Sequence, residues 1–220
     1  MRRTNWKTVS TLVTMALVAG CAESVVSPKA TPAAAPASVT FAPEGRPSLT
    51  LSGLASANTE SDFTVSQNGG VFFVGNQAVV FPASSICDPT TSTYGIGSWN
   101  DGCTPLNRSI TIHAVTRVSN GYSQVDFTPS LRFVPSDNPA RWVWLFMYTP
   151  SAIGATDLSQ FKIYYTPTLD GPLVDEASSD ASLRTYVDTR SGISLRRVTH
   201  FSGYTSWGFA CEAGSPGCTP

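Results

Sequence analysis

One run of residues constrains the fold more than any other part of this chain. Between Trp142 and Tyr148 every residue is apolar or aromatic. Successive side chains of a strand point to opposite faces, so Trp144 and Phe146 would lie on one face, and Val143 with the alternating residues after it on the other. Both faces would therefore be apolar. A strand that is apolar on both faces needs cover on both sides, which places it in the middle of a β-sandwich.

Short apolar runs divided by turn residues fill the rest of the chain beyond residue 48. Many are β-branched or aromatic and alternate in polarity, which is typical of strands. Gly69-Gly70, Gly75-Asn76 and Asn120-Gly121 are hairpin-type turns between them. Beyond a turn near Asp157–Gln160 the pattern favours no helix. The sequence therefore predicts an all-β fold, a β-sandwich over residues 49–210. The expected strands are Leu49–Leu54, Phe63–Ser66, Val71–Val74, Ala78–Phe81, Ser109–Val118, Tyr122–Phe127, Leu131–Val134, Trp142–Tyr148, Phe161–Tyr165, Leu183–Val187, Ser194–Thr199 and Tyr204–Phe209.

The first twenty residues have the pattern of an export signal. Arg2, Arg3 and Lys7 precede an apolar stretch, Val9–Val18, that is too short to cross a bilayer. The stretch ends in Leu17-Val18-Ala19-Gly20-Cys21, which resembles the lipobox of bacterial lipoproteins. The resemblance implies cleavage of residues 1–20 and a lipid on the thiol of Cys21, the alternative being an ordinary signal peptide that happens to meet a cysteine.

A lipid on Cys21 would hold the protein at the cell envelope. Ala22 follows Cys21 where an Asp would retain an enterobacterial lipoprotein in the inner membrane, so the resemblance favours the outer membrane. Residues 21–48 are rich in Ala, Pro, Ser and Thr and show no apolar periodicity. We therefore expect a disordered, extended tether between the lipid and the sandwich.

The cysteine count fits this organisation. Five cysteines leave one unpaired, and lipidation of Cys21 accounts for it. The other four form two local pairs, for which we predict the disulfides Cys87–Cys103 and Cys211–Cys218, the second closing a tail over residues 211–220. The crossed pairings stay open, while a zinc site is disfavoured because the spacings lack paired C-x-x-C motifs.

Charge excludes several classes of partner. Charged residues make up only 13% of the chain, and without Arg2, Arg3 and Lys7 it carries 11 basic and 15 acidic residues, a net charge near −4. A chain of this balance has no basic surface with which to attract nucleic acid or anionic headgroups. We expect no cofactor and no metal.

Several motifs resemble a known β-sandwich family. Gly69-Gly70-Val71-Phe72-Phe73-Val74-Gly75 leads into Ala78-Val79-Val80-Phe81-Pro82-Ala83, an order similar to the opening of the ZU-five domains of ankyrins, netrin receptors and zonula-occludens proteins. Ser123-Gln124-Val125-Asp126-Phe127-Thr128-Pro129, followed by Leu131-Arg132-Phe133, resembles the segment before the family's central strands. His200-Phe201-Ser202-Gly203-Tyr204 looks like the close of bacterial relatives.

The resemblance covers about residues 64–209, with a core near 63–150 and C-terminal strands near 160–209. The insert closed by Cys87 and Cys103 departs from the animal pattern. The resemblance implies a structural or protein-interaction module, without a substrate. We therefore expect a partner that is another envelope protein or polymer.

The tripeptide His200-Phe201-Ser202 is the sharpest chemical candidate. A few members of this family cleave themselves between Phe and Ser of such a tripeptide. The resemblance implies that Ser202 would attack the Phe201 carbonyl with His200 as general base, and that the piece from Ser202 onward would stay attached as a paired strand. The alternative, which we expect, is that His200 caps a strand, Phe201 fills the core and Ser202 bonds a turn.

The insert could also offer a ligand surface. Tyr94 and Trp99, or Trp207 near the C-terminus, could contact a carbohydrate or a partner, although packing of a turn is the favoured interpretation. Asp88 and Asp101 could bind calcium, but two carboxylates without a repeating acidic pattern favour a solvated loop.

The remaining polar residues suggest no chemistry. His113 lies within an expected strand and receives no role. The acidic residues between 168 and 180 are expected to form a solvated connection. They are Asp170, Asp175, Glu176 and Asp180.

Overall fold

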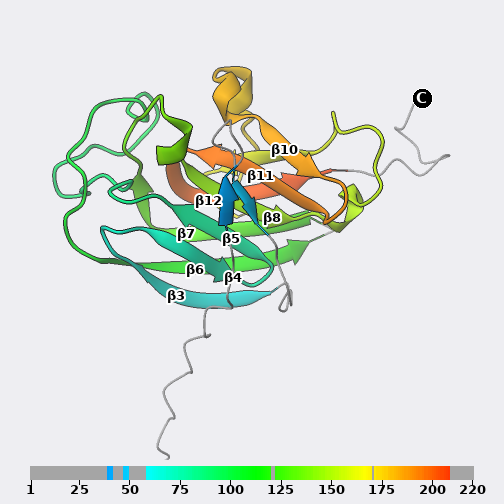
Figure 1. Cartoon of the computed structure of the whole chain (residues 1–220), viewed down its shortest axis with the longest axis horizontal. Coiled ribbons are helices and arrows are strands. Elements are labelled where there is room, and N and C mark those ends of the chain that lie inside the picture. The colour runs from blue at the N-terminus through cyan, green and yellow to red at the C-terminus, as the bar shows by residue number, and fades with distance from the viewer. Residues whose placement is uncertain (1–38, 42–46, 50–57, 120–121, 170, 209–220) are drawn as a thin grey trace, which may run out of the picture. The chain divides into compact units, whose positions relative to one another are not determined.

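The computed structural model describes residues 39–41, 47–49, 58–119, 122–169 and 171–208. These residues form two five-stranded antiparallel sheets and a separate two-stranded hairpin (Figure 1). Within the described ranges the only helical segments are four single 3-10 turns. The prediction of an all-β sandwich is confirmed.

The sheet centred on β8 has the strand order β10-β11-β8-β5-β4, and we call it the β8 sheet. Its strands are β4 (Gly70–Val74), β5 (Gln77–Phe81), β8 (Val143–Tyr148), β10 (Thr185–Asp188) and β11 (Ile193–Val198).

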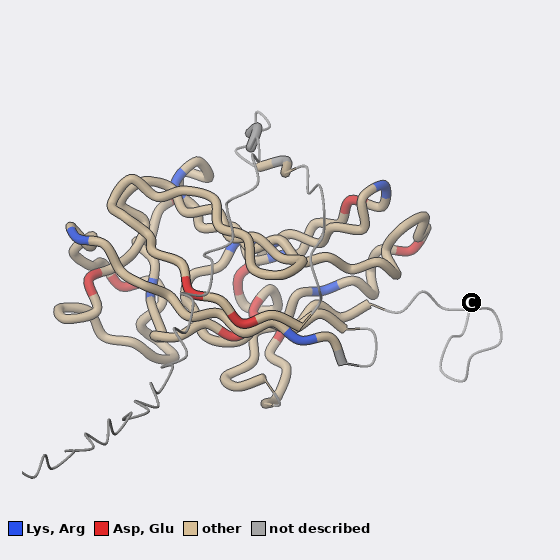
Figure 2. The backbone as a smooth tube through the Cα atoms, turned by 90° about the horizontal axis from the view of Figure 1, so that it is seen from below, with Lys and Arg blue, Asp and Glu red and all other residues tan. Residues whose placement is uncertain are grey.

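The second sheet, which we call the β12 sheet, has the order β3-β6-β7-β12-β9. Its strands are β3 (Thr59–Val65), β6 (Ile110–Ser119), β7 (Tyr122–Arg132), β9 (Lys162–Thr166) and β12 (His200–Trp207). Figure 2 shows how sparsely charged residues are placed along the backbone of this domain.

The main core lies between the two sheets. The alternating residues Val143, Leu145 and Met147 of β8 are buried in it, together with aromatic rings from both sheets. Phe201 of β12 stacks on Phe127 of β7, with ring centroids 4.0 Å apart. Close packing of this kind is the main source of stability of a sandwich.

A second apolar cluster covers the outer face of the β8 sheet. Trp144 and Phe146 of β8 are buried there although they point away from the main core. Leu49, from the hairpin of β1 (Val39–Phe41) and β2 (Pro47–Leu49), is buried in the same cluster. Figure 1 shows this hairpin in front of the sheet. The prediction that β8 is covered on both faces is confirmed.

The hairpin corrects one prediction. A tether without structure was expected to extend to residue 48, but residues 39–41 pair with residues 47–49. The pattern misled because prolines dominate the composition there, whereas Pro47 lies in an edge strand, where its missing N–H leaves no partner unsatisfied.

Most strand positions were predicted correctly, with shifts at the ends. Strand β3 begins at Thr59 rather than Phe63, and Leu183 lies in a 3-10 turn before β10. Strand β7 continues through Pro129, where two separate strands were expected. Proline is accommodated because β7 bulges at this point: four residues, 127–130, occupy the space opposite the single residue Ser202 of β12.

The predicted leader, the lipidated Cys21, the tether to residue 38, the strand over residues 50–54 and the Cys211–Cys218 pair lie outside the described residues. No helix in the described part of the chain has the length and apolarity needed to cross a membrane.

Candidate functional site

The polar centre of the molecule lies where the chain passes from one sheet to the other. Strand β11 ends at Val198 in the β8 sheet and β12 begins at His200 in the β12 sheet. The crossing brings Arg196 and His200 together, and both side chains are fully buried. Buried groups of this kind need partners, since an unpaired polar group in the interior is costly.

Glu176 supplies those partners. It lies in the 3-10 turn Glu176–Ser178, and one carboxylate oxygen, Oε1, accepts a hydrogen bond from His200 Nε2 at 2.8 Å. The other oxygen, Oε2, accepts one from Arg196 Nη2 at 2.5 Å. Arg196 Nη1 donates in turn to the Ile163 carbonyl. We call Glu176, Arg196 and His200 the crossover triad.

The triad holds its carboxylate in the ionised form. Burial alone would raise the pKa of Glu176, but the hydrogen bond and the electrostatic attraction from His200, together with the positive charge of Arg196, outweigh burial and lower the pKa. An ionised carboxylate only accepts hydrogen bonds, so Nε2 of His200 carries the proton between them. The other ring nitrogen, Nδ1, is buried without a hydrogen-bond partner in the described part of the chain.

The disulfide-closed insert covers His200. The predicted Cys87–Cys103 bond is confirmed. Inside the closed loop, the Trp99 ring stacks on the His200 ring with centroids 3.9 Å apart, and Tyr94 packs edge-on against Trp99 at 4.8 Å. Both rings thus have the turn-packing role that was favoured over ligand contact.

Arg132 fixes the same loop from the sheet beneath it. It lies at the end of β7, and its Nη1 donates to the Ser98 and Asp101 carbonyls at 2.5 Å each. The insert is therefore held in three ways, by a covalent bond, by a buried guanidinium and by stacking on His200. A loop held in this way loses little conformational entropy when it binds a partner.

The Phe201–Ser202 bond lies directly beneath Tyr94. The Tyr94 hydroxyl donates to the Phe201 carbonyl at 2.6 Å. Ser202 lies at the bulge between β12 and β7. Burial raises the pKa of the Tyr94 phenol, and the nearby Ser202 hydroxyl acts in the opposite direction. Even so, Ser202 Oγ makes no hydrogen bond of acceptable geometry within the described residues. Of the expected structural role only the core position of Phe201 is therefore seen. The His200 ring bonds the Glu176 side chain and caps no strand, and Ser202 bonds no turn within the described residues.

A pocket of about 580 Å³ opens beside the insert. Its walls come from the insert, from the end of β9 with the loop that follows, and from the 3-10 turns before β10. The lining residues are Ile96, Gly97, Trp99, Asn100, Tyr165, Pro167, Pro172, Val174, Asp175, Glu176, Ser178, Ser179, Asp180, Leu183 and Thr199. This volume lies in the range typical of ligand sites.

Exposed apolar side chains line the pocket or lie close in sequence to residues that line it. Ile96 at the tip of the insert is 93% exposed, and Tyr94 is 40% exposed. Leu173 and Val174, on the loop after β9, are 40% and 41% exposed. We call these four residues the loop patch. Contiguous apolar surface marks interaction sites more often than isolated apolar residues do, and Ile96 and Val174 share the lining of one pocket.

The acidic segment is more than a solvated connection. Asp175 accepts from Lys162 Nζ at 2.7 Å and caps the turn at Glu176 through the Ala177 N–H. Asp180 caps the next turn through the Ser182 N–H. The expectation of a solvated loop is wrong for Glu176, because its carboxylate neutralises two buried side chains; Asp170 lies outside the described residues.

The other predicted site residues lie elsewhere. His113 lies on the outer face of the β12 sheet between Glu60 and Asp62, with nitrogen–oxygen distances of 3.2 and 2.7 Å. Trp207, at the far end of β12, stacks with Tyr122 at 4.2 Å, so Tyr94, Trp99 and Trp207 form no common surface. Carbohydrate binding stays a prediction.

The acidic residues of the insert have structural partners. The Asp88 carboxylate accepts from the backbone and the hydroxyl of Thr90 and lies 3.7 Å from Arg108. Asp101 contributes its carbonyl to Arg132. Among the described residues no group of three or more potential metal ligands is found.

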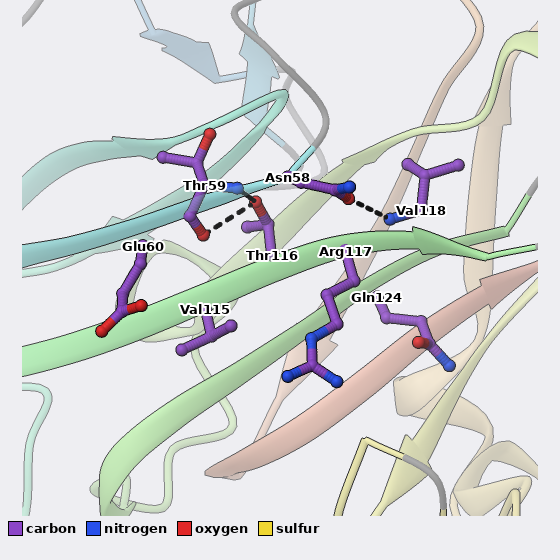
Figure 3. Close-up of a pocket in the computed structure, with 8 residues that line it drawn as sticks. All are labelled: Asn58, Thr59, Glu60, Val115, Thr116, Arg117, Val118 and Gln124. Carbon is purple, nitrogen blue, oxygen red and sulfur yellow. Dashed lines mark hydrogen bonds between the residues drawn. The ribbon is translucent and has the colours of Figure 1, made fainter.

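A second hollow, of about 530 Å³, lies near the start of β3. Glu60, Arg117 and Gln124 extend into it in Figure 3, while Thr59 and Thr116 bond to each other at its edge. Its walls are mostly polar, and none of the site residues predicted from the sequence lines it.

Glu176 and Arg196 were missed as functional residues. A signal for Arg196 existed, because Arg196 and Arg197 are adjacent in β11 and point to opposite faces, so that one of them faces the other sheet and needs a buried partner. No local pattern indicates which of the acidic residues in a distant loop is that partner.

Comparison with known proteins adds no relative: no family model, curated protein or solved structure matches the chain.

Proposed function

We propose that the chain is a lipid-anchored cell-envelope protein whose sandwich is a binding module, with the loop patch and the adjoining pocket as the contact surface. The observation that carries the proposal is the exposure of Ile96 and Val174 beside a pocket on loops that are fixed from behind. Fixed apolar surface favours association, because little freedom remains to be lost on binding.

The sequence supports the cellular part of the proposal. The lipobox-like residues before Cys21 provide a membrane anchor through a lipid, with the outer membrane as the favoured site, and the Pro-rich segment that follows separates the domain from the bilayer. The resemblance to ZU-five domains supports a structural or protein-binding role. The partner would be another envelope protein or polymer.

Binding to isolated cell envelopes tests the contact surface. The mature chain carrying Cys21→Ser removes the lipid as a reason for co-sedimentation. Ile96→Ser should weaken sedimentation with envelopes about tenfold, the effect of losing one buried aliphatic side chain. Ile153→Ser is the matched control, since Ile153 is also exposed, at 54%, and does not line the pocket. Equal binding of both variants would refute the proposed surface.

The anchor has its own test. Intact mass measurement of the native protein should show a chain that begins at Cys21 and carries acyl groups, and Cys21→Ser should release the protein from membranes. A Cys21→Ser protein that still partitions with membranes would contradict the anchor while leaving the loop patch untouched.

Self-cleavage between Phe201 and Ser202 is a second candidate. It is favoured by the hydrogen bond from the Tyr94 hydroxyl to the Phe201 carbonyl, next to a buried Ser202 Oγ that has no hydrogen-bond partner among the described residues. A donor at this oxygen would stabilise the charge that develops there when Oγ attacks the carbonyl carbon. Glu176 binds Nε2 of His200, so Nδ1 is the nitrogen that would take the Ser202 proton when the two side chains approach, since no hydrogen bond joins them among the described residues.

The steps balance without a further reagent except water. The Oγ–C bond forms, the C–N bond breaks, and the proton held by His200 passes to the released amine of Ser202. Water then hydrolyses the ester, which leaves a carboxylate on Phe201 and restores the serine hydroxyl.

Intact mass measurement over prolonged incubation decides this candidate. Cleavage should yield two fragments whose masses sum to the chain plus one water, should disappear in Ser202→Ala, and should slow in Tyr94→Phe. A single unbroken wild-type chain would exclude it.

A further inference from the structure

We infer that the pocket beside the insert binds a protein segment that combines apolar side chains with one lysine or arginine. The inference rests on the proposed binding function and adds the chemistry of the partner. It follows from the division of the pocket lining into an apolar wall and an acidic rim.

The apolar wall comes from three separate segments. Trp99 and Ile96 contribute from the insert, Tyr165 and Val174 from β9 and the loop behind it, and Leu183 from the turn before β10. Pro167 and Pro172 complete the wall. Aromatic-lined grooves accept extended peptides, because flat rings offer a large contact area at a low cost in entropy.

The rim carries charge of one sign. Three of the lining residues are acidic and none is basic. Two of the three carboxylates are already neutralised, since Asp175 pairs with Lys162 and Glu176 with Arg196. The acidic side chain left for a partner is therefore the third.

That third carboxylate belongs to Asp180. Its Oδ1 accepts the Ser182 N–H, which leaves the second oxygen available. Arg197 attracts Asp180 electrostatically, but it donates to the Ser182 hydroxyl and lies over the Trp142 ring, and no direct ion pair joins it to Asp180 among the described residues. A lysine or arginine on the bound segment would supply a direct ion pair to Asp180.

The same charges argue against a lipid headgroup. A bilayer surface with anionic phosphates is attracted by basic side chains, and none lines this pocket. Ile96 at the rim would be covered on binding, and its removal should therefore abolish recognition of the apolar part of the segment.

Peptide selection tests the inference. A random peptide library displayed on phage is panned against the mature chain carrying Cys21→Ser, and the selected peptides are then synthesised and titrated. We expect them to combine apolar residues with one lysine or arginine and to lose most of their affinity with Ile96→Ser. Asp180→Asn should weaken them about fivefold, the effect of one partly exposed ion pair, and added salt should reduce that difference.

Asp157→Asn is the matched control. Asp157 also accepts the N–H of the residue two positions ahead, here Ser159, but it does not line the pocket. This variant should bind the selected peptides as the wild type does, which separates the loss of a rim charge from the loss of a turn hydrogen bond.

The outcomes separate the two proposals. Peptides that depend on Ile96 but carry no basic residue, or that ignore Asp180→Asn, would refute the inference and leave the binding function intact. A selection that yields no Ile96-dependent peptide would refute both. Sedimentation of the Cys21→Ser chain with phospholipid vesicles, abolished by Ile96→Ser, would show a bilayer as the occupant and would also overturn the inference.

Discussion

His200 and Phe201 are neighbours in one strand, both fully buried, and yet they occupy opposite kinds of interior. Phe201 lies among the rings of Phe81, Phe127 and Phe133 in the main core. His200 lies under Trp99 and is hydrogen-bonded to Glu176. The apolar side stabilises the domain through contact area, which has little directional preference, whereas the polar side requires particular partners at particular distances.

The two sides therefore stabilise different parts of the structure. The main core joins the sheets. The crossover triad joins the loops to the sheets, because Glu176 is in a loop while Arg196 and His200 are in strands. Changes on the apolar side should therefore lower the stability of the whole domain, and changes on the polar side should act on the loops as well.

The largest effect is expected from Phe201→Ala. Removal of a ring that contacts three others should lower the free energy of unfolding by about 3–5 kcal/mol, the usual cost of such a truncation. Chemical denaturation monitored by circular dichroism measures it. Phe201→Leu keeps much of the volume and should cost distinctly less. If Phe201→Ala lowered the free energy of unfolding less than Phe201→Leu does, the core would be less tightly packed than the ring contacts indicate.

Removal of the disulfide should have the next largest effect. Cys87→Ser with Cys103→Ser opens a loop closed by residues 16 positions apart, which corresponds to about 3 kcal/mol in chain-entropy terms. Because Trp99 stacks on His200, its fluorescence should also change, unlike in Phe201→Leu. An unchanged unfolding midpoint would show that Arg132 and the stacking hold the insert without the covalent bond.

Glu176→Gln should cost about 2 kcal/mol, since a hydrogen-bonded charge is lost while the shape is kept. The variant should also loosen the loop, which increased amide hydrogen exchange over residues 171–183 would report. Glu60→Gln is the control, because Glu60 pairs with His113 at an exposed position and should change stability little. Equal behaviour of the two variants would contradict a special role for the crossover triad.

The smallest effect is a dependence on pH. The pKa of Glu176 is lowered in the folded protein, so the stability that its charge provides is fully present above the ordinary pKa of 4.5 and is lost as the pH falls through the lower, folded pKa. The difference in unfolding free energy between wild type and Glu176→Gln should therefore shrink in acid. The pKa of Asp126 is raised, chiefly by burial, and shifts stability in the opposite direction, but it is common to both proteins and cancels in the difference.

The sequence was a good guide to the apolar side of this comparison. The run from Trp142 to Tyr148 indicated a strand covered on both faces, and β8 has this position because alternation with a period of two is a local property. The placement of Phe201 in the core follows from the same alternation. The covering hairpin was not predicted, because its composition resembles that of a tether.

The polar side could be predicted only in part. The tripeptide at His200 and the Cys87–Cys103 bond were identified, since both are visible in local sequence. Glu176 lies 24 residues before His200, and only the folded chain brings the two together. Long-range pairing of single polar residues leaves no periodic pattern, which is why Glu176 was assigned to a solvated connection.

The tip of the insert is sterically open. A Cβ added at Gly95 or Gly97 would meet nothing within 4 Å, although their φ angles of +145° and +93° favour glycine. Ile96 between them is almost wholly exposed, while the bonds that fix the insert lie at its base. Substitutions at Ile96 can therefore accumulate without endangering folding, so that the proposed contact surface can change at a single position on a constant scaffold.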